Sequence, residues 1–193
     1  MTANFPDNRH AAIAAAYDFS RTRLIADIGG GNGATLRHIL ALFPQPRGLI
    51  FDREDVVATL STDDRMHGRI DAQGGSFFDA VPAGADAYLL IRVLHNWNDD
   101  DCLRILRACR HAMQADAVLL LGEEMLEIDP GRGQATAYLI DVQMMTMFGH
   151  ARTRSESEFG ALLDQSGFML RRVIHTASPV SIIEGTPVPA RVG

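Results

Sequence analysis

Short apolar runs alternate with segments in which apolar residues recur at helical spacing over most of this chain. The run Leu24-Ile25-Ala26 stops at glycines and predicts a buried strand over 23–28. Residues 34–43 then predict a helix, which Pro44 ends. The same patterns predict further strands at 48–51, 69–72, 86–93 and 117–122, and further helices at 11–19, 56–60, 99–113, 134–148 and 155–166.

The last part of the chain departs from this alternation. Residues 168–175 and 180–184 predict two strands joined only by 176–179, and strands joined so briefly must be antiparallel. Strands that alternate with helices predict a parallel sheet covered on both faces. We therefore expect an α/β fold with a Rossmann-like, mostly parallel sheet of seven strands and a carboxyl-terminal antiparallel hairpin. Residues 1–22 should form a tail and a helix, and 23–193 one ligand-binding domain.

Composition narrows the class of protein. The 193 residues suffice for one α/β domain, and 47% hydrophobic residues allow a packed core. A net charge of −6 without a Lys/Arg cluster argues against a nucleic-acid partner. No run approaches the roughly 20 apolar residues of a membrane helix, and no signal pattern begins the chain. Cys102 and Cys109 lie too far apart on one predicted helix for a disulfide, so a reduced, cytoplasmic location is expected.

Three glycines follow the first predicted strand and open the next helix. Gly29, Gly31 and Gly33 let the backbone turn sharply and approach a ligand closely. The helix N-terminus adds free N–H groups and a positive dipole end, which suit an anionic group. A tight turn without a ligand is the alternative, but the glycines together with Asp27 and Asp52 exceed what a turn needs.

The two carboxylates bear on which nucleotide this loop would bind. Asp27 precedes the glycines, where a negative charge suits the cationic amino-acid end of S-adenosylmethionine and would repel a pyrophosphate. Asp52 ends the second predicted strand, where it can accept both ribose hydroxyls of any nucleoside. Gly29, Gly31 and Ala34 also satisfy the dinucleotide pattern G-x-G-x-x-G/A, so a nicotinamide oxidoreductase stays the alternative from another class.

A histidine lies at the carboxyl end of a predicted central strand, where ligand chemistry occurs in open α/β sheets. His95 follows strand 86–93 and precedes Trp97, the only tryptophan of the chain. A lone histidine is more often structural, and its context makes this one a candidate. Neutral imidazole, with an ordinary pKa of about 6.5, can accept a proton at cellular pH.

Two acidic runs are not expected to form a metal site or a pair of catalytic acids. Asp99-Asp100-Asp101 predicts the solvated start of helix 99–113, with Asp99 as a cap, and no metal site is expected there. In Glu123-Glu124 only one side chain should face the cleft, because neighbouring strand residues point to opposite sides.

With these segments in place, the sequence resembles the small-molecule O-methyltransferases of the caffeic acid, acetylserotonin and bacterial polyketide-tailoring type. The resemblance implies the class I methyltransferase fold, S-adenosyl-L-methionine as the cofactor, and methyl transfer to a hydroxyl of a small, aromatic metabolite. It runs from about Leu24 to Glu184 and rests on Asp27-Ile28-Gly29-Gly30-Gly31, Gly48-Leu49-Ile50-Phe51-Asp52, Gly74-Gly75-Ser76-Phe77-Phe78, Leu94-His95-Asn96-Trp97 and Arg152-Thr153.

The resemblance also implies roles for single residues. His95 would be the general base, and Glu123 the acid that orients it. Gly29 and Gly31 would lie under the methionine part of the cofactor, and Asp52 would hold the ribose. The full sets are Asp27, Gly29, Gly31, Asp52, Ser76, Phe77 and Arg92 for the cofactor, and Trp97, Met144 and Met145 for the acceptor.

The chain departs from its relatives at three points. Ser76 stands where the family usually has Asp beside the adenine, and Ala151 where many members carry Glu near the base. A non-methylating tailoring enzyme that binds the same cofactor, of the decarboxylase or hydroxylase type, is therefore a second interpretation. Members also normally begin with a helical domain that dimerises and covers the acceptor. A homodimer, a missing amino-terminal domain, or a module inactive without that lid is therefore expected.

Overall fold

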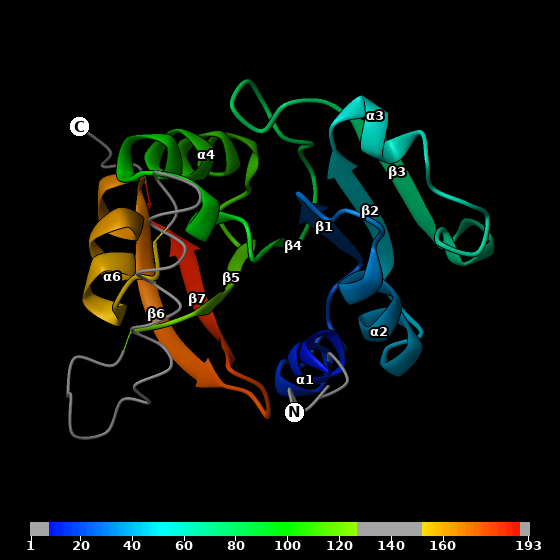
Figure 1. Ribbon diagram of the computed structural model, residues 1–193, viewed down its shortest axis with the longest axis horizontal. Helices are drawn as coiled ribbons and strands as arrows, with labels where there is room; N and C mark the ends of the chain where they lie inside the picture. Colours follow the sequence, from blue (N-terminus) through cyan, green and yellow to red (C-terminus); the bar gives the residue numbers. More distant parts are fainter. Residues whose placement is uncertain (1–7, 127–151, 190–193) are drawn as a thin grey trace, which may run out of the picture.

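The computed structural model describes residues 8–126 and 152–189, which form one sheet with helices on both sides (Figure 1). The sheet has seven strands in the order β3-β2-β1-β4-β5-β7-β6. The strands are β1 (Leu24–Ile28), β2 (Arg47–Asp52), β3 (Ile70–Gly74), β4 (Ala87–Ile91), β5 (Val118–Glu124), β6 (Phe168–His175) and β7 (Val180–Pro187).

The helices lie close to where the hydrophobic spacing predicts them. The predicted helix over 134–148 lies outside the described residues. Two short 3₁₀ turns, η1 (Met66–Gly68) and η2 (Leu94–Asn96), interrupt the loops. The α-helices are α1 (Arg9–Ala16), α2 (Ala34–Leu42), α3 (Glu54–Val57), α4 (Asp99–Ala112) and α6 (Glu156–Gln165). None of the described helices is long and apolar enough to cross a membrane.

Strand pairing confirms the predicted α/β topology. The strands β3, β2, β1, β4 and β5 pair in parallel. Strand β7 is antiparallel to both β5 and β6, which is the predicted carboxyl-terminal hairpin. The strand order reverses between β1 and β4, and ligands of doubly wound sheets bind in the crevice outside the carboxyl ends at such a switch point.

Alternate side chains of the central strands form two separate cores. On β4, Tyr88 and Leu90 pack in one core and Ala87 and Leu89 in the other, which explains the continuous apolar run in the sequence. Helices α4 and α6 cover the first core, and α1 and α2 the second (Figure 1). The central strands are therefore buried on both faces of the sheet.

Helix α4 begins differently from the prediction. The cap is Asn98, whose side-chain oxygen accepts the backbone N–H of Asp101 at 2.9 Å. The prediction that Asp99 is the cap is wrong, whereas its side chain is 50% exposed, as expected for a solvated helix start. Asp99 is the first helical residue, and its carboxylate accepts hydrogen bonds from the guanidinium groups of Arg152 and Arg154. Asn98 is the cap because its side-chain oxygen can reach the first backbone N–H groups of the helix, which have no partner within the helix.

Candidate active site

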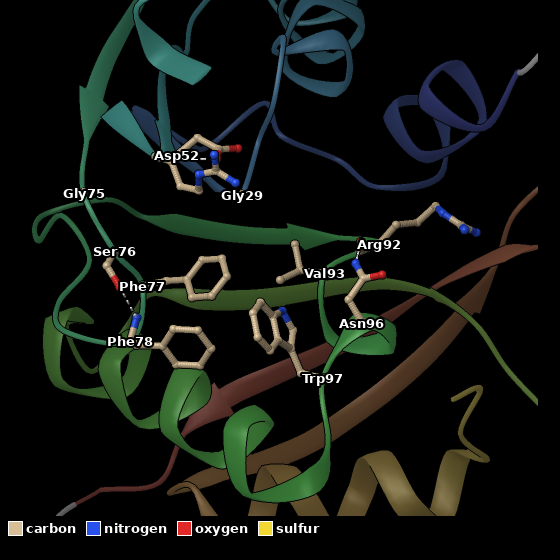
Figure 2. Close-up of a pocket in the computed structure, with 11 residues that line it drawn as sticks. Gly29, Asp52, Gly75, Ser76, Phe77, Phe78, Arg92, Val93, Asn96 and Trp97 are labelled. Carbon is tan, nitrogen blue, oxygen red and sulfur yellow. Dashed lines mark hydrogen bonds between the residues drawn. The ribbon is translucent and has the colours of Figure 1, made fainter. Parts of the chain in front are cut away.

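A cavity of about 390 Å³ lies at the carboxyl edge of the parallel strands, beside the switch point. Its lining combines the turn after β1, the end of β2, the loop after β3 and the turn after β4. Figure 2 shows Gly29 and Asp52 at one end and the rings of Phe77, Phe78 and Trp97 at the other. The volume falls within the usual range for small-molecule sites.

The aromatic end of this cavity is a compact cluster of three rings. The Phe78 and Trp97 centroids lie 4.8 Å apart, those of Phe77 and Phe78 5.0 Å apart, and all three pairs are edge-to-face. The Arg104 guanidinium covers the Phe78 ring at 4.7 Å. Such a wall offers flat apolar surface to a planar ring.

At the polar end, Asp52 ties the glycine loop to β2. One carboxylate oxygen accepts the backbone N–H of Gly31 at 2.8 Å, and the other accepts that of Arg53 at 2.7 Å. The loop itself needs glycine. Gly33 has φ of +75°, and a Cβ there would lie 2.4 Å from Cδ1 of Ile50. The loop is thus tightly packed behind the cavity.

A second cavity of about 220 Å³ adjoins the first and shares Gly29 and Arg92 with it. Asp27 lies here, only 2% exposed, and its Oδ1 has no hydrogen-bond partner among the described residues. Burial, and then the charge of Asp52, raise the pKa of Asp27 to about 7. A buried acceptor without a donor is costly, so this site fits a cationic donor such as an ammonium group.

Arg92 borders both cavities at the end of β4. Its backbone has φ of +56°, which is unusual outside glycine, and its guanidinium pairs with the carboxylate of Glu124 on β5. Glu124 therefore faces away from its neighbour Glu123, as the strand alternation predicts.

The histidine segment forms the η2 turn directly after β4. The Nδ1 atom of His95 lies 3.0 Å from Oε2 of Glu123, a carboxylate that is only 1% exposed. The other oxygen of Glu123 accepts the backbone N–H of Leu94 at 2.8 Å. The structure thus brings together two residues 28 positions apart, as the resemblance implies.

His95 is next to the larger cavity rather than in its lining. Val93, Asn96 and Trp97, from the same turn, are lining residues. One short segment therefore carries both the wall of the cavity and the imidazole.

Ser76 lies in the lining at the position that departs from the family. Its hydroxyl accepts the backbone N–H of Phe78 at 3.2 Å and shapes the turn after β3. Met144, Met145 and Ala151 lie outside the described residues. Within the described ranges, no group of His, Cys, Asp and Glu side chains could hold a metal ion.

Arg154 is the residue that the sequence did not reveal. Its side chain is fully buried and hydrogen-bonds to the backbone carbonyls of Leu94 and Trp97. Arg152, the arginine singled out in the sequence, has a side chain 38% exposed. Nothing in the local sequence separates these two arginines, because the acceptors that hold the Arg154 side chain are 55 to 60 positions away, at Leu94, Trp97 and Asp99.

Comparisons with known proteins agree with this geometry. Residues 9–169 match the family described as O-methyltransferase domain, so the chain belongs to this family. It is 40% identical over 176 residues to the mitomycin biosynthesis 6-O-methyltransferase of Streptomyces lavendulae, covering 89% of this chain and 49% of that protein. It is also 40% identical over 168 residues to the 3-amino-4-hydroxybenzoate 4-O-methyltransferase of Streptomyces cremeus, covering 84% and 45%.

Solved structures give the same result. The crystal structure of LaPhzM superposes with a TM-score of 0.86 at 37% identity and covers 94% of this chain and 55% of that one. The O-methyltransferase NcsB1 from neocarzinostatin biosynthesis, solved with S-adenosylmethionine and 2-hydroxy-5-methyl naphthoic acid, superposes with a TM-score of 0.79 at 35% identity, covering 91% and 52%. The chain spans about half the length of the curated relatives it matches.

Proposed function

We propose that this chain binds S-adenosyl-L-methionine at the carboxyl edge of β1 and β2 and transfers a methyl group to a hydroxyl of a small aromatic metabolite. The observation that carries the proposal is the η2 turn, whose residues line the larger cavity while His95 contacts buried Glu123 at 3.0 Å. One short segment therefore lines the cavity and also carries the candidate base, whose imidazole contacts a buried carboxylate.

The residues around the two cavities fit the parts of this cofactor. Asp52 would hold the ribose, and the ring of Phe77 would lie against the adenine. Ser76 would offer a hydroxyl where relatives offer a carboxylate. Asp27 would face the ammonium group, which supplies the donor that its unpaired Oδ1 lacks. When bound, the cofactor supplies an electrophilic methyl group on a sulfonium centre.

Asp27 also supports this cofactor over a nicotinamide dinucleotide. Its carboxylate is buried below the glycine loop, where a pyrophosphate would add negative charge to a site already containing Asp27 and Asp52. At short range in a poorly solvated site such repulsion is strong. A cation at the same place is favoured for the same reason.

His95 would act as the general base on the acceptor hydroxyl. If Nδ1 carries the hydrogen and donates it to Glu123, Nε2 keeps its lone pair and can take the hydroxyl proton. The buried carboxylate then stabilises the imidazolium that forms. The remaining catalysis would be alignment of the acceptor oxygen with the methyl group.

Relatives suggest the acceptor class. The Streptomyces cremeus protein is named for 3-amino-4-hydroxybenzoate, and NcsB1 was solved with a naphthoic acid. We propose hydroxylated aromatic acids of this kind as acceptors, with Trp97, Met144 and Met145 as contacts. The sequence-based expectations of a cytoplasmic location and a homodimer stay predictions.

The substitution His95→Ala tests the proposed mechanism. With 3-amino-4-hydroxybenzoate and S-adenosylmethionine as probes, we expect kcat to fall by roughly 10²- to 10⁴-fold, the usual contribution of a general base. Cofactor affinity, measured by calorimetry, should be nearly unchanged. His111→Ala, at an exposed position near the end of α4, is the matched control and should keep normal turnover. Unchanged turnover in His95→Ala would remove His95 from the mechanism.

A further inference from the structure

A buried arginine that the proposed mechanism does not use lies beneath the histidine turn. Arg154 is 0% exposed, and it has the largest fully buried side chain among the residues that the structure describes. Burying a guanidinium is costly unless its N–H groups find acceptors and its charge finds a partner. The partners of Arg154 therefore indicate what it holds in place.

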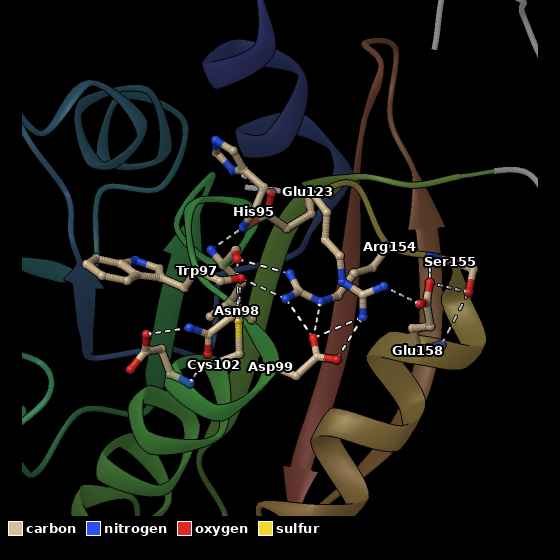
Figure 3. Close-up of polar contacts among 12 residues, drawn as sticks. His95, Trp97, Asn98, Asp99, Cys102, Glu123, Arg154, Ser155 and Glu158 are labelled. Atoms are coloured by element: carbon tan, nitrogen blue, oxygen red, sulfur yellow. Dashed lines mark hydrogen bonds and ion pairs between the residues drawn. The ribbon is translucent and has the colours of Figure 1, made fainter. Parts of the chain in front are cut away.

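The guanidinium bonds to the carbonyls that close the turn (Figure 3). Nη1 donates to the Leu94 carbonyl at 3.1 Å, and Nη2 donates to the Trp97 carbonyl at 2.7 Å. Nε and Nη2 also donate to one carboxylate oxygen of Asp99, at 2.9 and 2.7 Å. Arg154 thus joins both ends of the turn to the start of α4, which requires the planar fork of arginine.

The other side of the same turn is held by Glu123. Its Oε1 accepts the backbone N–H of Leu94 at 2.8 Å and that of His95 at 3.4 Å, while Oε2 contacts the imidazole. The N–H groups of Leu94 and His95 therefore face a buried carboxylate, and the carbonyls of Leu94 and Trp97 face a buried guanidinium. Opposite charges fix the segment from both sides.

Backbone pairing holds the segment that carries Arg154 beside the segment that carries Glu123. Arg154 forms a parallel bridge with Met125, and its carbonyl accepts the N–H of Leu126 at 3.0 Å. The N–H of Arg152 donates to the carbonyl of His95, also at 3.0 Å. The segment with Arg154 therefore runs beside the end of β5, which carries Glu123.

The whole network has one negative charge in excess while the imidazole is neutral. Its carboxylates are Glu123, Asp99 and Glu158, and its cations are Arg152 and Arg154. A proton taken up by His95 would balance this charge. An imidazolium at His95 would therefore face opposite charge in this cluster.

We propose that Arg154, together with Asp99, is a positioning residue for His95. It fixes the turn so that Nδ1 stays directed at Glu123 and Nε2 stays available to the acceptor. The inference rests on the proposed role of His95 as the base. Arg154 is not itself a lining residue of either cavity, so it would act only through the turn.

The variant Arg154→Lys keeps the charge and removes the fork, so it isolates positioning. Long-range ¹H–¹⁵N NMR of the imidazoles reports which ring nitrogen carries the hydrogen, and the His95 signals are assigned by their loss in His95→Gln. We expect the Nδ1–H tautomer in the normal chain and a mixture of tautomers in Arg154→Lys. With the probes used above, kcat at saturating cofactor should fall by roughly ten- to a hundredfold, as for a misplaced catalytic group.

Asp99→Asn provides a second variant if the buried substitution prevents folding, because the Asp99 side chain is 50% exposed. It should change the tautomer in the same direction, with a smaller loss of kcat. Arg172→Lys is the matched control, since Arg172 pairs with Glu184 at 2.7 Å on the distant β6–β7 hairpin. It should leave both readouts unchanged.

Two results separate the possible failures. A normal tautomer and a normal kcat in the folded variants, with only a lower melting temperature, would overturn the positioning role and leave Arg154 merely structural. Full methylation by His95→Ala would instead remove His95 as the base, whatever its tautomer, and absence of methylation by the normal chain would overturn the proposed function.

Discussion

At Asp27 a carboxylate is enclosed below the glycine loop with one oxygen unpaired. Sequence position alone predicted an acid suited to a cation, but not its burial or its lack of a donor. Those properties depend on the packing of the loop around it, as at Gly30, where a Cβ would lie 2.8 Å from the carboxylate. The nearby charge of Asp52 adds to the rise in the pKa of Asp27.

Stability should therefore depend on pH through Asp27. Its pKa in the folded chain, about 7, lies above the ordinary value of 3.8, so the folded state binds the proton more tightly than the unfolded state. The free energy of unfolding should fall as pH rises from about 4 to 7, by roughly 3 kcal/mol between pH 5 and pH 8. Urea unfolding at both pH values measures this contribution.

Asp27→Asn should remove that dependence and be more stable than the normal chain at pH 8. Asp71→Asn, an exposed change on β3, is the control and should follow the normal pH profile. An equal loss of stability between pH 5 and pH 8 in Asp27→Asn would show that Asp27 does not cause it.

At the scale of elements, the turn between β1 and α2 needs glycine for two reasons: the backbone there is left-handed, and a side chain would collide with its neighbours. Gly33 has a positive φ and would place a Cβ 2.4 Å from Ile50, whereas Gly84 has φ of +88° with nothing within 4 Å. Comparing alanine at the two positions separates strain from overpacking.

We expect Gly84→Ala to cost about 1–2 kcal/mol from left-handed backbone alone. Gly33→Ala should cost about 1–3 kcal/mol more, because Ile50 must move within a packed core. Denaturant unfolding of both variants tests this difference. Equal costs would mean that the loop has room for a side chain.

Elements with regular hydrophobic spacing could be predicted from the sequence, and their ends less well. Strand β5 was expected to end at Gly122 but continues to Glu124, because β7 pairs with these residues. The roles of Asp99 and Arg154 depend on contacts 55 positions apart, which no local pattern encodes. The His95–Glu123 pair could be predicted because the family resemblance supplied it.

At the scale of the whole molecule, the doubly wound sheet places four loop ends around one switch point. The turns after β1 and β4 and the ends of β2 and β3 all reach the larger cavity. The alternation of strands and helices was enough to predict this edge as the candidate site, and the larger cavity lies there. The acceptor contacts expected from Met144 and Met145 lie outside the described residues.

The central claim is that a sulfonium nucleoside binds between the glycine loop and Asp52. Calorimetric titration of the normal chain and of Asp52→Asn, with Asp71→Asn as control, tests it most directly. We expect S-adenosylmethionine to bind one per chain, NAD not to bind, and Asp52→Asn to weaken the affinity roughly tenfold or more through lost charged hydrogen bonds. Absence of binding by S-adenosylmethionine, or equal affinity for NAD, would contradict the account.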